Sequence, residues 1–264
     1  MIVQSKRILR KVIPTRFHAS VFFPAYLRDL VFHRTNMVIA SGPFRGMKYI
    51  NFSHGSVLVP KILGIYEREL HTTLDEALTL RLARVVDIGA AEGYYAVGMA
   101  CKLPNVEVIA FETDGKAQTL MSELAVANDV SDRLTIHGEC ISSDLRKVIR
   151  DGNDTLVICD VEGAEKYLLD PKELSSLRHC HIAVELHKRN TPDILQTIRD
   201  RFSSTHDITE IHQEMRSRQE FPYQTLLTRI CPPTYVDNAL SEFRQPWEPK
   251  MSWLWMRVKS ALAA

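Results

Sequence analysis

The stretch RVVDIGAAEGYYAVGMA, Arg84 to Ala100, decides how the rest of the chain is interpreted. It begins with a short β-branched run, continues into a turn of small residues that contains Gly89 and Gly93, and then becomes helix-like. Glycine allows a backbone to approach a ligand closely, and the first N–H groups of the following helix are free to bind one. The stretch therefore predicts a strand, a cofactor-binding turn and a helix.

The same alternation of strand and helix patterns continues along the chain. β-branched runs recur in NVEVIAFE, RLTIHG, DTLVICDV, HCHIAVELH and HDITEIHQE, and PKMSWLWMRV supplies a last strand. Helix-compatible segments lie near 93–103, 115–128, 143–151, 163–178 and 192–202. Strands that alternate with helices predict an α/β fold, with a parallel sheet covered by helices on both faces.

The flanking regions differ from this pattern. We expect residues 1–83 to form an N-terminal extension of helices and a hairpin, and residues 84–264 to form the main domain. Within the extension, SGPFRGMKYI predicts a strand–turn–strand element, and apolar residues from Gly64 to Ala83 recur at helical spacing. Within the main domain, residues 214–249 predict a mostly irregular insertion over the active edge of the sheet.

Composition excludes several classes of protein. The chain has 264 residues, is 45% hydrophobic and carries a net charge of +1, so no global field attracts nucleic acid. The five cysteines are scattered without metal-ligand spacing, which is typical of reduced thiols in a cytoplasmic protein. We find no apolar run long enough to cross a bilayer and no cleavable signal pattern.

The first 34 residues alternate basic and apolar side chains. Lys6, Arg7, Arg10 and Lys11 stand among Ile8, Leu9, Val12 and Ile13. One interpretation is a helix that makes peripheral contact with an anionic membrane surface. The other is a helix packed on the domain with its basic groups in solvent.

The glycine turn does not match the dinucleotide pattern G-x-G-x-x-G, because Ala90, Ala91 and Glu92 separate its two glycines. Glu92 would repel a pyrophosphate, and a second acid, Asp87, ends the preceding strand. Acids at this position suit a cofactor that carries an ammonium and a sulfonium, such as S-adenosylmethionine. The missing pattern also argues against a nicotinamide-dependent oxidoreductase.

Two further acids follow the next two strands. Glu112 in AFETD is placed to bridge ribose hydroxyls, and Glu139 in HGEC could accept a hydrogen bond from an adenine amino group. The alternative is that Glu92 and Glu139 only flank helix starts, where carboxylates are mildly favourable. Three acids, each just after a strand, nevertheless converge at one edge of the predicted sheet.

The segments VVDIGAAEGYYAVGMA and AFETD resemble motif I and the ribose-binding acid of class I S-adenosylmethionine-dependent methyltransferases. ICDVEGAEKYLL and the following AVELH resemble the FkbM type within that class, over about Tyr66 to Arg201. The resemblance implies a seven-stranded Rossmann-like sheet and methyl transfer, often to a hydroxyl. Ala91 departs from the common D-x-G-x-G-x-G pattern. The expected cofactor-binding residues are Asp87, Gly89, Ala90, Glu92, Gly93, Glu112, Glu139 and Asp160.

The chemistry is expected at the ends of the fourth and fifth predicted strands. Asp160 ends one strand, and Glu185 and His187, two residues apart, point the same way from the other. We predict Asp160 and His187 as catalytic residues that orient the acceptor or remove its proton, and Glu185 as a substrate contact. The same three residues could instead bind Mg²⁺, Mn²⁺ or Zn²⁺.

Two residues before the sheet complete the expected site. Tyr66 and Glu67 in GIYEREL could close over the cofactor from an N-terminal helix and contact the substrate, or could belong to a solvated helix face. The sequence as a whole predicts O-methylation of a hydroxyl on a small molecule or sugar. A non-catalytic cofactor-binding module of the same fold remains an alternative, and the sequence leaves open the acceptor and the oligomeric state.

Overall fold

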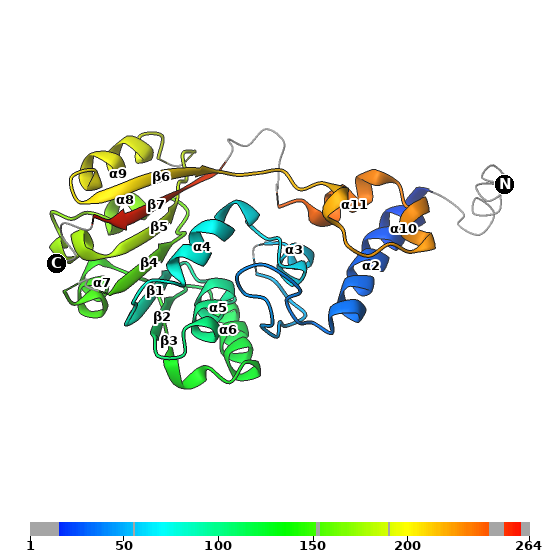
Figure 1. Cartoon of the computed structure of the whole chain (residues 1–264), viewed down its shortest axis with the longest axis horizontal. Coiled ribbons are helices and arrows are strands. Elements are labelled where there is room, and N and C mark those ends of the chain that lie inside the picture. The colour runs from blue at the N-terminus through cyan, green and yellow to red at the C-terminus, as the bar shows by residue number, and fades with distance from the viewer. Residues whose placement is uncertain (1–15, 55, 152–153, 190, 243–250, 260–264) are drawn as a thin grey trace.

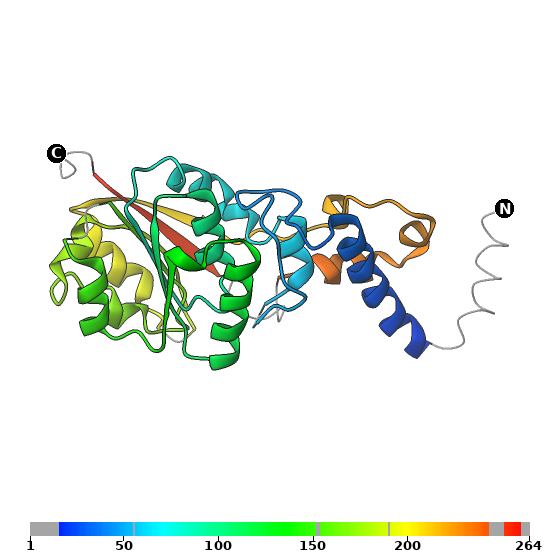
Figure 2. The ribbon, with the colours of Figure 1, turned by 90° about the horizontal axis from the view of Figure 1, so that it is seen from below.

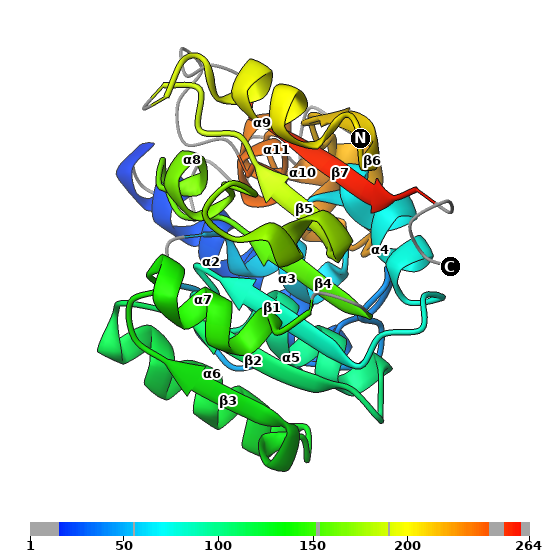
Figure 3. The ribbon, with the colours of Figure 1, turned by 90° about the vertical axis from the view of Figure 1, so that its left-hand side faces the viewer.

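The computed structural model describes residues 16–54, 56–151, 154–189, 191–242 and 251–259. Its centre is a seven-stranded sheet with the strand order β3-β2-β1-β4-β5-β7-β6 (Figure 3). Strands β1 to β5 pair in parallel, whereas β7 runs antiparallel to both β5 and β6. The strands are β1 Arg84–Ile88, β2 Glu107–Phe111, β3 Leu134–His137, β4 Thr155–Cys159, β5 His181–Glu185, β6 His206–His212 and β7 Ser252–Val258.

This strand order, with its reversed β7, is the Rossmann-like sheet of methyltransferases, so the predicted fold is confirmed. Each strand predicted for the alternating region, and the last strand, is present in the sheet. All residues of β1 and β4 are buried, which explains why apolar residues predominate in these parallel strands without a regular alternation with polar ones. The reversal of β7 was not apparent from the alternating pattern, since a strand's direction is set by its connection rather than by its composition.

Helices cover both faces of the sheet. Helices α4, α5 and α6 lie on one face and α7, α8 and α9 on the other (Figure 1). The sheet has a hydrophobic core on each face, and successive residues of a strand point into opposite cores. Val85 packs on the face covered by α5, and Val86 and Ile88 pack on the face covered by α7. The α-helices are α2 Arg16–Thr35, α3 Leu58–Leu63, α4 His71–Ala77, α5 Tyr94–Lys102, α6 Gly115–Ala127, α7 Ser142–Ile149, α8 Glu165–Leu168, α9 Ile194–Phe202, α10 Leu226–Ile230 and α11 Pro233–Leu240. The 3₁₀ helices are η1 Arg68–Leu70, η2 Ser131–Arg133, η3 Ser175–His179 and η4 Arg218–Glu220.

Two predicted helices are wrong in extent. The segment from Gly64 to Ala83 does not form one helix, because Glu67 takes a left-handed conformation with φ 44° and helical structure is confined to η1 and α4, which ends at Ala77. Tyr66 and Glu67 consequently lie in a turn before η1 and α4. The predicted helix at 163–178 is divided into α8 and η3. The strand–turn–strand element at 41–50 is reduced to one antiparallel bridge between Val38 and Lys48.

The predicted irregular insertion is also wrong in part, because it contains η4, α10 and α11. These elements pack with α2 and α3 into a lobe beside the sheet (Figure 2). The ring of Phe23 in α2 stacks on that of Tyr235 in α11, with centroids 5.6 Å apart. Residues 1–15 and 243–250, on which parts of both flank predictions fall, lie outside the described residues.

Within the described ranges, no helix combines the length and apolarity needed to cross a bilayer. The five cysteines are free thiols, as expected, and Cys159, Cys180 and Cys231 are buried.

Candidate functional site

The turn after β1 is built by three residues with positive φ. Gly89, Ala91 and Gly93 have φ values of 83°, 47° and 91°. A Cβ on Gly89 would lie 1.7 Å from the carbonyl oxygen of Asp160, and one on Gly93 would lie 2.5 Å from Met121 Cγ. Both glycines are therefore required by the packing of the protein itself, in addition to any role toward a ligand. Ala90 is buried, and its N–H donates to the carbonyl of Phe111.

Glu92 faces the N-terminal segment. Its carboxylate accepts hydrogen bonds from Lys61 Nζ at 2.6 Å, Tyr49 Oη at 2.6 Å and Ser53 Oγ at 2.8 Å. Burial raises the pKa of Glu92, but the charge of Lys61 and these hydrogen bonds outweigh that effect and lower it. Glu92 is 0% exposed, so its placement argues against the predicted cofactor contact. It instead ties the turn to the N-terminal extension.

Glu112 joins the ends of β1 and β2. Its carboxylate accepts one hydrogen bond from the Ala91 N–H and another from the Asp114 N–H, both at 2.8 Å. Glu112 is only half-buried, and each carboxylate oxygen has a further lone pair for a ligand hydroxyl. Glu139 lies in the exposed turn after β3. Both residues thus remain available to a ligand at this edge of the sheet.

Asp87 has a buried carboxylate oxygen without a partner. The residue is 2% exposed, and its Oδ2 has no hydrogen bond among the described residues. Burial raises the pKa of Asp87 to about 7, against a hydrogen bond from the Ala96 backbone that lowers it. A buried polar atom left unpaired costs free energy unless a ligand or water meets it, so Asp87 is suited to receive a cationic or hydrogen-bond-donating group.

The predicted catalytic residues come together at the carboxyl ends of β4 and β5. Nε2 of His187 lies 3.4 Å from Asp160 Oδ1 and 3.6 Å from Glu185 Oε2. Asp160, Glu185 and His187 each offer a ligand atom, and these three atoms lie within 4.8 Å of one another. Burial raises the pKa of both Asp160 and Glu185. The charge of Asp160 raises the pKa of Glu185 further, whereas a hydrogen bond with Glu185 and the charge of His187 only partly offset the rise at Asp160, so this pair keeps a proton to higher pH than an isolated carboxyl group.

Glu165 fixes the His187 ring from the other side. Its Oε1 lies 2.5 Å from His187 Nδ1 and also accepts the Gly163 N–H at 3.1 Å. Glu165 is 0% exposed and its pKa is lowered: burial raises it, but the hydrogen bond and charge of His187 outweigh burial. For His187, burial lowers the pKa, and Glu165 with Asp160 more than reverses this. The sequence alone did not mark Glu165 as a partner of His187.

Tyr66 and Glu67 border the same cluster from the turn before η1. Glu67 is buried with a φ of 44°, and its carboxylate accepts a short hydrogen bond from the Tyr95 hydroxyl. Burial first, and then the charge of Asp160, raises the pKa of Glu67 well above its ordinary value. The charges of Glu67, Glu185 and Asp160 likewise contribute to a raised pKa of Tyr66, after burial. Both residues lie in a turn and not in a helix, and their contact with a substrate stays a prediction.

A buried arginine, which sequence reasoning missed, attaches the inserted segment to this turn. Arg216 pairs with Glu69 at 2.5 Å and with Glu242 at 3.2 Å, and all three side chains are nearly inaccessible. Glu242 also accepts the Glu67 N–H at 3.3 Å. Burial raises the pKa of Glu242 to about 7, against the lowering effect of Arg216. No local pattern marks these residues, because they are far apart in the sequence.

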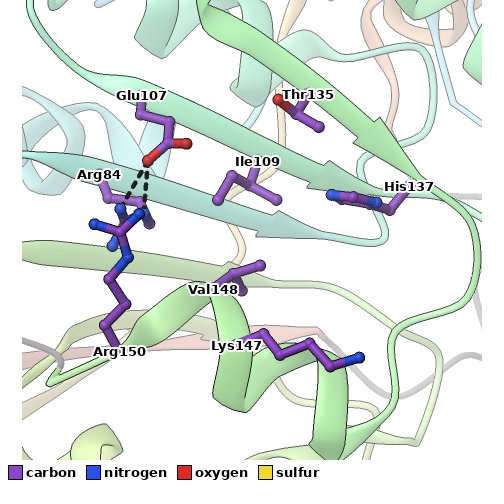
Figure 4. Close-up of a pocket in the computed structure, with 8 residues that line it drawn as sticks. All are labelled: Arg84, Glu107, Ile109, Thr135, His137, Lys147, Val148 and Arg150. Carbon is purple, nitrogen blue, oxygen red and sulfur yellow. Dashed lines mark hydrogen bonds and ion pairs between the residues drawn. The ribbon is translucent and has the colours of Figure 1, made fainter.

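A separate hollow of about 200 Å³ lies between the sheet and α7 (Figure 4). Arg84 and Glu107, the first residues of β1 and β2, form an ion pair at 2.7 Å on its wall. The remaining lining residues are Ile109, Thr135, His137, Lys147, Val148 and Arg150. None of them belongs to the predicted site, so this hollow is distinct from the cluster around His187.

Among known proteins, the chain resembles solved structures, and the resemblance is weak. No family model matches the chain, and no curated protein matches it significantly. One of the solved structures that resemble it is the O-methyltransferase TomG of tomaymycin synthesis from Streptomyces achromogenes, in complex with S-adenosylmethionine. The two proteins are 13% identical, the alignment covers 74% of this chain and 81% of that chain, and the TM-score is 0.46. A precorrin-6Y C5,15-methyltransferase from Geobacter metallireducens has 10% identity, coverages of 77% and 94%, and a TM-score of 0.47. An rRNA methylase from Streptococcus thermophilus has 13% identity, coverages of 72% and 97%, and a TM-score of 0.45. Similarity at this level does not identify a substrate.

Proposed function

We propose that this chain is an S-adenosylmethionine-dependent methyltransferase of the FkbM type that methylates a hydroxyl group on a small molecule or sugar. The observation that carries the proposal is the placement of His187. Its Nδ1 is held by Glu165 at 2.5 Å, and its Nε2 faces Asp160 at the strand ends next to the glycine turn. We retain the cytoplasm as the proposed location, on the ground of the free cysteines.

The residues around the glycine turn fit the cofactor. The unpartnered Oδ2 of Asp87 is suited to a cation, and the half-buried carboxylate of Glu112 is suited to two vicinal hydroxyls. Gly89, Ala90 and Gly93 supply the turn, and Glu139 supplies an exposed acceptor at the third strand end. When bound there, S-adenosylmethionine would supply a methyl group on a positively charged sulfur. An edge of the sheet rich in carboxylates favours such a charge over a pyrophosphate.

His187 is the proposed base. Because the Nδ1–H group of His187 donates a hydrogen bond to Glu165, the neutral ring carries its proton on Nδ1. Its Nε2 is then free to accept a proton. A hydroxyl that donates to Nε2 becomes a better nucleophile, and its proton passes to the ring as the oxygen attacks. Asp160, 3.4 Å from Nε2, stabilises the imidazolium that this step creates and can orient the acceptor.

The walls of the cluster support a hydroxyl-rich acceptor. The carboxyl groups of Glu185 and Glu67 offer hydrogen-bond acceptors, and the aromatic residue Tyr66, which is partly exposed, is near enough for their charges to raise its pKa. Sugars combine hydroxyl donors with apolar C–H faces, so they match this combination of groups. The adjoining Arg216–Glu242 pair holds the turn of Glu67 in place.

A divalent cation is the second candidate for activating the hydroxyl. It is favoured by the convergence of Asp160, Glu185 and His187 within 4.8 Å, since oxygen and imidazole donors suit Mg²⁺, Mn²⁺ or Zn²⁺. In that version Glu165 would orient a ligating histidine instead of a base. The histidine-base mechanism and the metal mechanism use the same residues, but only the metal mechanism is expected to be sensitive to a chelator.

The test is methyl transfer from labelled S-adenosylmethionine to a panel of sugars and hydroxylated metabolites. We expect a labelled product with at least one acceptor, and we expect His187→Ala to lower turnover by roughly 10²–10⁴-fold with little change in S-adenosylmethionine affinity. Full turnover in both His187→Ala and Asp160→Ala would contradict the assignment. Cofactor binding without transfer to any acceptor would favour the non-catalytic module.

A further inference from the structure

The hollow between the sheet and α7 has a charged end and an apolar middle (Figure 4). Arg84 opens β1 and Glu107 opens β2, and the register of the two strands places these residues side by side. Alternate residues of a strand face the same side of a sheet, so Ile109 follows Glu107 along the wall of the hollow. Val148 of α7 adds a second apolar group.

The guanidinium group of Arg84 is buried but incompletely paired. Its side chain is 10% exposed, whereas that of Glu107 is 48% exposed. The Nε and Nη2 groups of Arg84 both donate to Glu107 Oε2, at 3.0 Å and 2.7 Å. Within the part of the chain that the structure describes, the Nη1 group has no partner. A guanidinium carries five N–H donors in a rigid fork, so donors remain for a ligand with an anionic group.

Arg150 brings a second guanidinium group to the hollow. It follows the last residue of α7 with a φ of 57°, in the region that favours glycine, so an arginine there costs conformational free energy. Its side chain is exposed, and no hydrogen bond or ion pair joins it to another described residue. In Figure 4 it extends from α7 toward the side of the hollow where Arg84 and Glu107 pair.

The charge around the hollow is positive on balance. Its cationic residues are Arg84, Lys147 and Arg150, and Glu107 is the single acid among the lining residues. Lys147 is itself paired at 2.8 Å with Asp144, which lies outside the lining. If that pair is counted as neutral, two guanidinium groups face one carboxylate. The excess of positive charge favours an anionic ligand.

We propose that this hollow binds a small phosphate ester. Its phosphate group lies between the guanidinium groups of Arg84 and Arg150, because guanidinium forks match phosphate oxygens with paired hydrogen bonds. Its organic part lies over Ile109, where Thr135 of β3 offers a hydroxyl group. A volume of about 200 Å³ suits a small metabolite. The net charge of +1 gives the chain no extended basic field, which argues against nucleic acid as the occupant.

This site is separate from the proposed cofactor site. Arg84 begins β1, and the glycine turn follows the other end of that strand. With a rise of about 3.3 Å per residue, Arg84 and Gly89 lie roughly 16 Å apart along the strand. The phosphate group is therefore held at the amino end of β1, away from the carboxyl edge of the sheet. The proposal does not depend on methyl transfer.

The test is titration calorimetry of the full chain with glycerol 3-phosphate and with acetate, in a buffer free of phosphate. We expect glycerol 3-phosphate to bind, and we expect Arg150→Gln to weaken its binding at least about tenfold. Arg229→Gln is the matched control, because Arg229 is exposed on α10, outside the hollow, and the change in net charge is the same. This control should bind the ester as the parent chain does.

A pair of variants at Thr135 separates charge from size. Thr135→Glu places a carboxylate in the hollow, and Thr135→Gln places a neutral group of the same size there. We expect Thr135→Glu to bind glycerol 3-phosphate more weakly than Thr135→Gln does, because like charges repel. Equal binding by the two variants, with unchanged far-ultraviolet circular dichroism, would contradict an anionic ligand.

The proposal is overturned if glycerol 3-phosphate does not bind the parent chain, or if Arg150→Gln binds it as tightly as Arg229→Gln does. Binding of acetate without binding of the ester would overturn it in favour of a carboxylate ligand. Displacement of the ester by saturating S-adenosylhomocysteine would assign the hollow to the cofactor and would also overturn it. Ester binding that persists in the presence of S-adenosylhomocysteine supports the proposal, whether or not a methyl acceptor is found.

Discussion

The Nδ1 atom of His187 lies 2.5 Å from Oε1 of Glu165, and this contact crosses from the end of β5 to the first turn of α8. It determines which ring nitrogen of His187 carries the proton in the neutral ring. It also leaves Nε2 facing Asp160 and Glu185. The proposed reaction depends on this orientation.

Glu165→Gln should therefore lower turnover roughly 10–10²-fold while leaving the S-adenosylmethionine dissociation constant nearly unchanged, because the ring loses its anionic anchor but remains in the site. The measurement is kcat and the cofactor dissociation constant for both proteins. Glu123→Gln is the control, because Glu123 is exposed on α6 and is not among the acids that contact His187. Equal turnover in both variants would show that Glu165 does not position the base.

The pH dependence follows from the raised pKa of His187. A base must be neutral to accept a proton, so turnover should fall as pH decreases through this pKa, which lies above the ordinary value of 6.5. Glu165→Gln removes a group that raises the pKa, and the acid limb should consequently move to lower pH. A pH–rate profile of both proteins measures this shift. An acid limb that stays in place would mean that another group titrates.

Chelation distinguishes a site in which His187 acts as the base from a site in which a divalent cation activates the hydroxyl. We expect turnover to survive EDTA, because the contact of Glu165 with Nδ1 is enough to present Nε2 of His187 as a proton acceptor without a metal ion. The measurement is the rate before and after EDTA treatment, followed by addition of Mg²⁺, Mn²⁺ or Zn²⁺. Loss of activity that one of these ions restores would assign Asp160, Glu185 and His187 as ligands instead.

Stability should depend on the buried pair of Lys61 and Glu92. Lys61→Met leaves the Glu92 carboxylate buried without its cation, and should lower the free energy of unfolding by about 3–5 kcal/mol in denaturant melts. Lys147→Met is the control, because Lys147 is 73% exposed in its pair with Asp144, and should change it by about 0.5 kcal/mol or less. Similar losses in both variants would contradict a structural role for the buried pair.

The same pair predicts a loss of stability in acid. The pKa of Glu92 in the folded chain lies below its ordinary value of 4.5, so its contribution is present above that value and is lost as pH falls through the folded pKa. Lys61→Met should therefore show a weaker dependence of unfolding on pH below about 4.5.

Much of this arrangement could be predicted from the sequence, because it depends on local patterns. The strands were apparent from buried β-branched runs, and parallel strands place Asp160, Glu185 and His187 at one edge. The role of Glu92 could not be predicted, because its partner Lys61 lies 31 residues earlier and reaches it only through the packing of α3. Glu165 was missed for a related reason, since it reaches His187 only through the turn that begins α8.

The insertion shows the same limit. Arg216 becomes a buried ion-pair partner only when residues 214–242 pack against the turn of Glu67. Neither the composition of the surrounding sequence nor the spacing of its charged residues distinguishes Arg216 from an exposed arginine.

The central claim is that the edge of the sheet around Asp87 and Glu112 binds S-adenosylmethionine. Titration calorimetry with S-adenosylhomocysteine and with NAD tests it most directly, using the parent chain and Glu112→Gln, which retains one carbonyl oxygen to accept the Ala91 N–H. The account predicts that S-adenosylhomocysteine binds, that NAD does not, and that Glu112→Gln weakens binding by about 1.5–3 kcal/mol. Binding of NAD without binding of S-adenosylhomocysteine would contradict it.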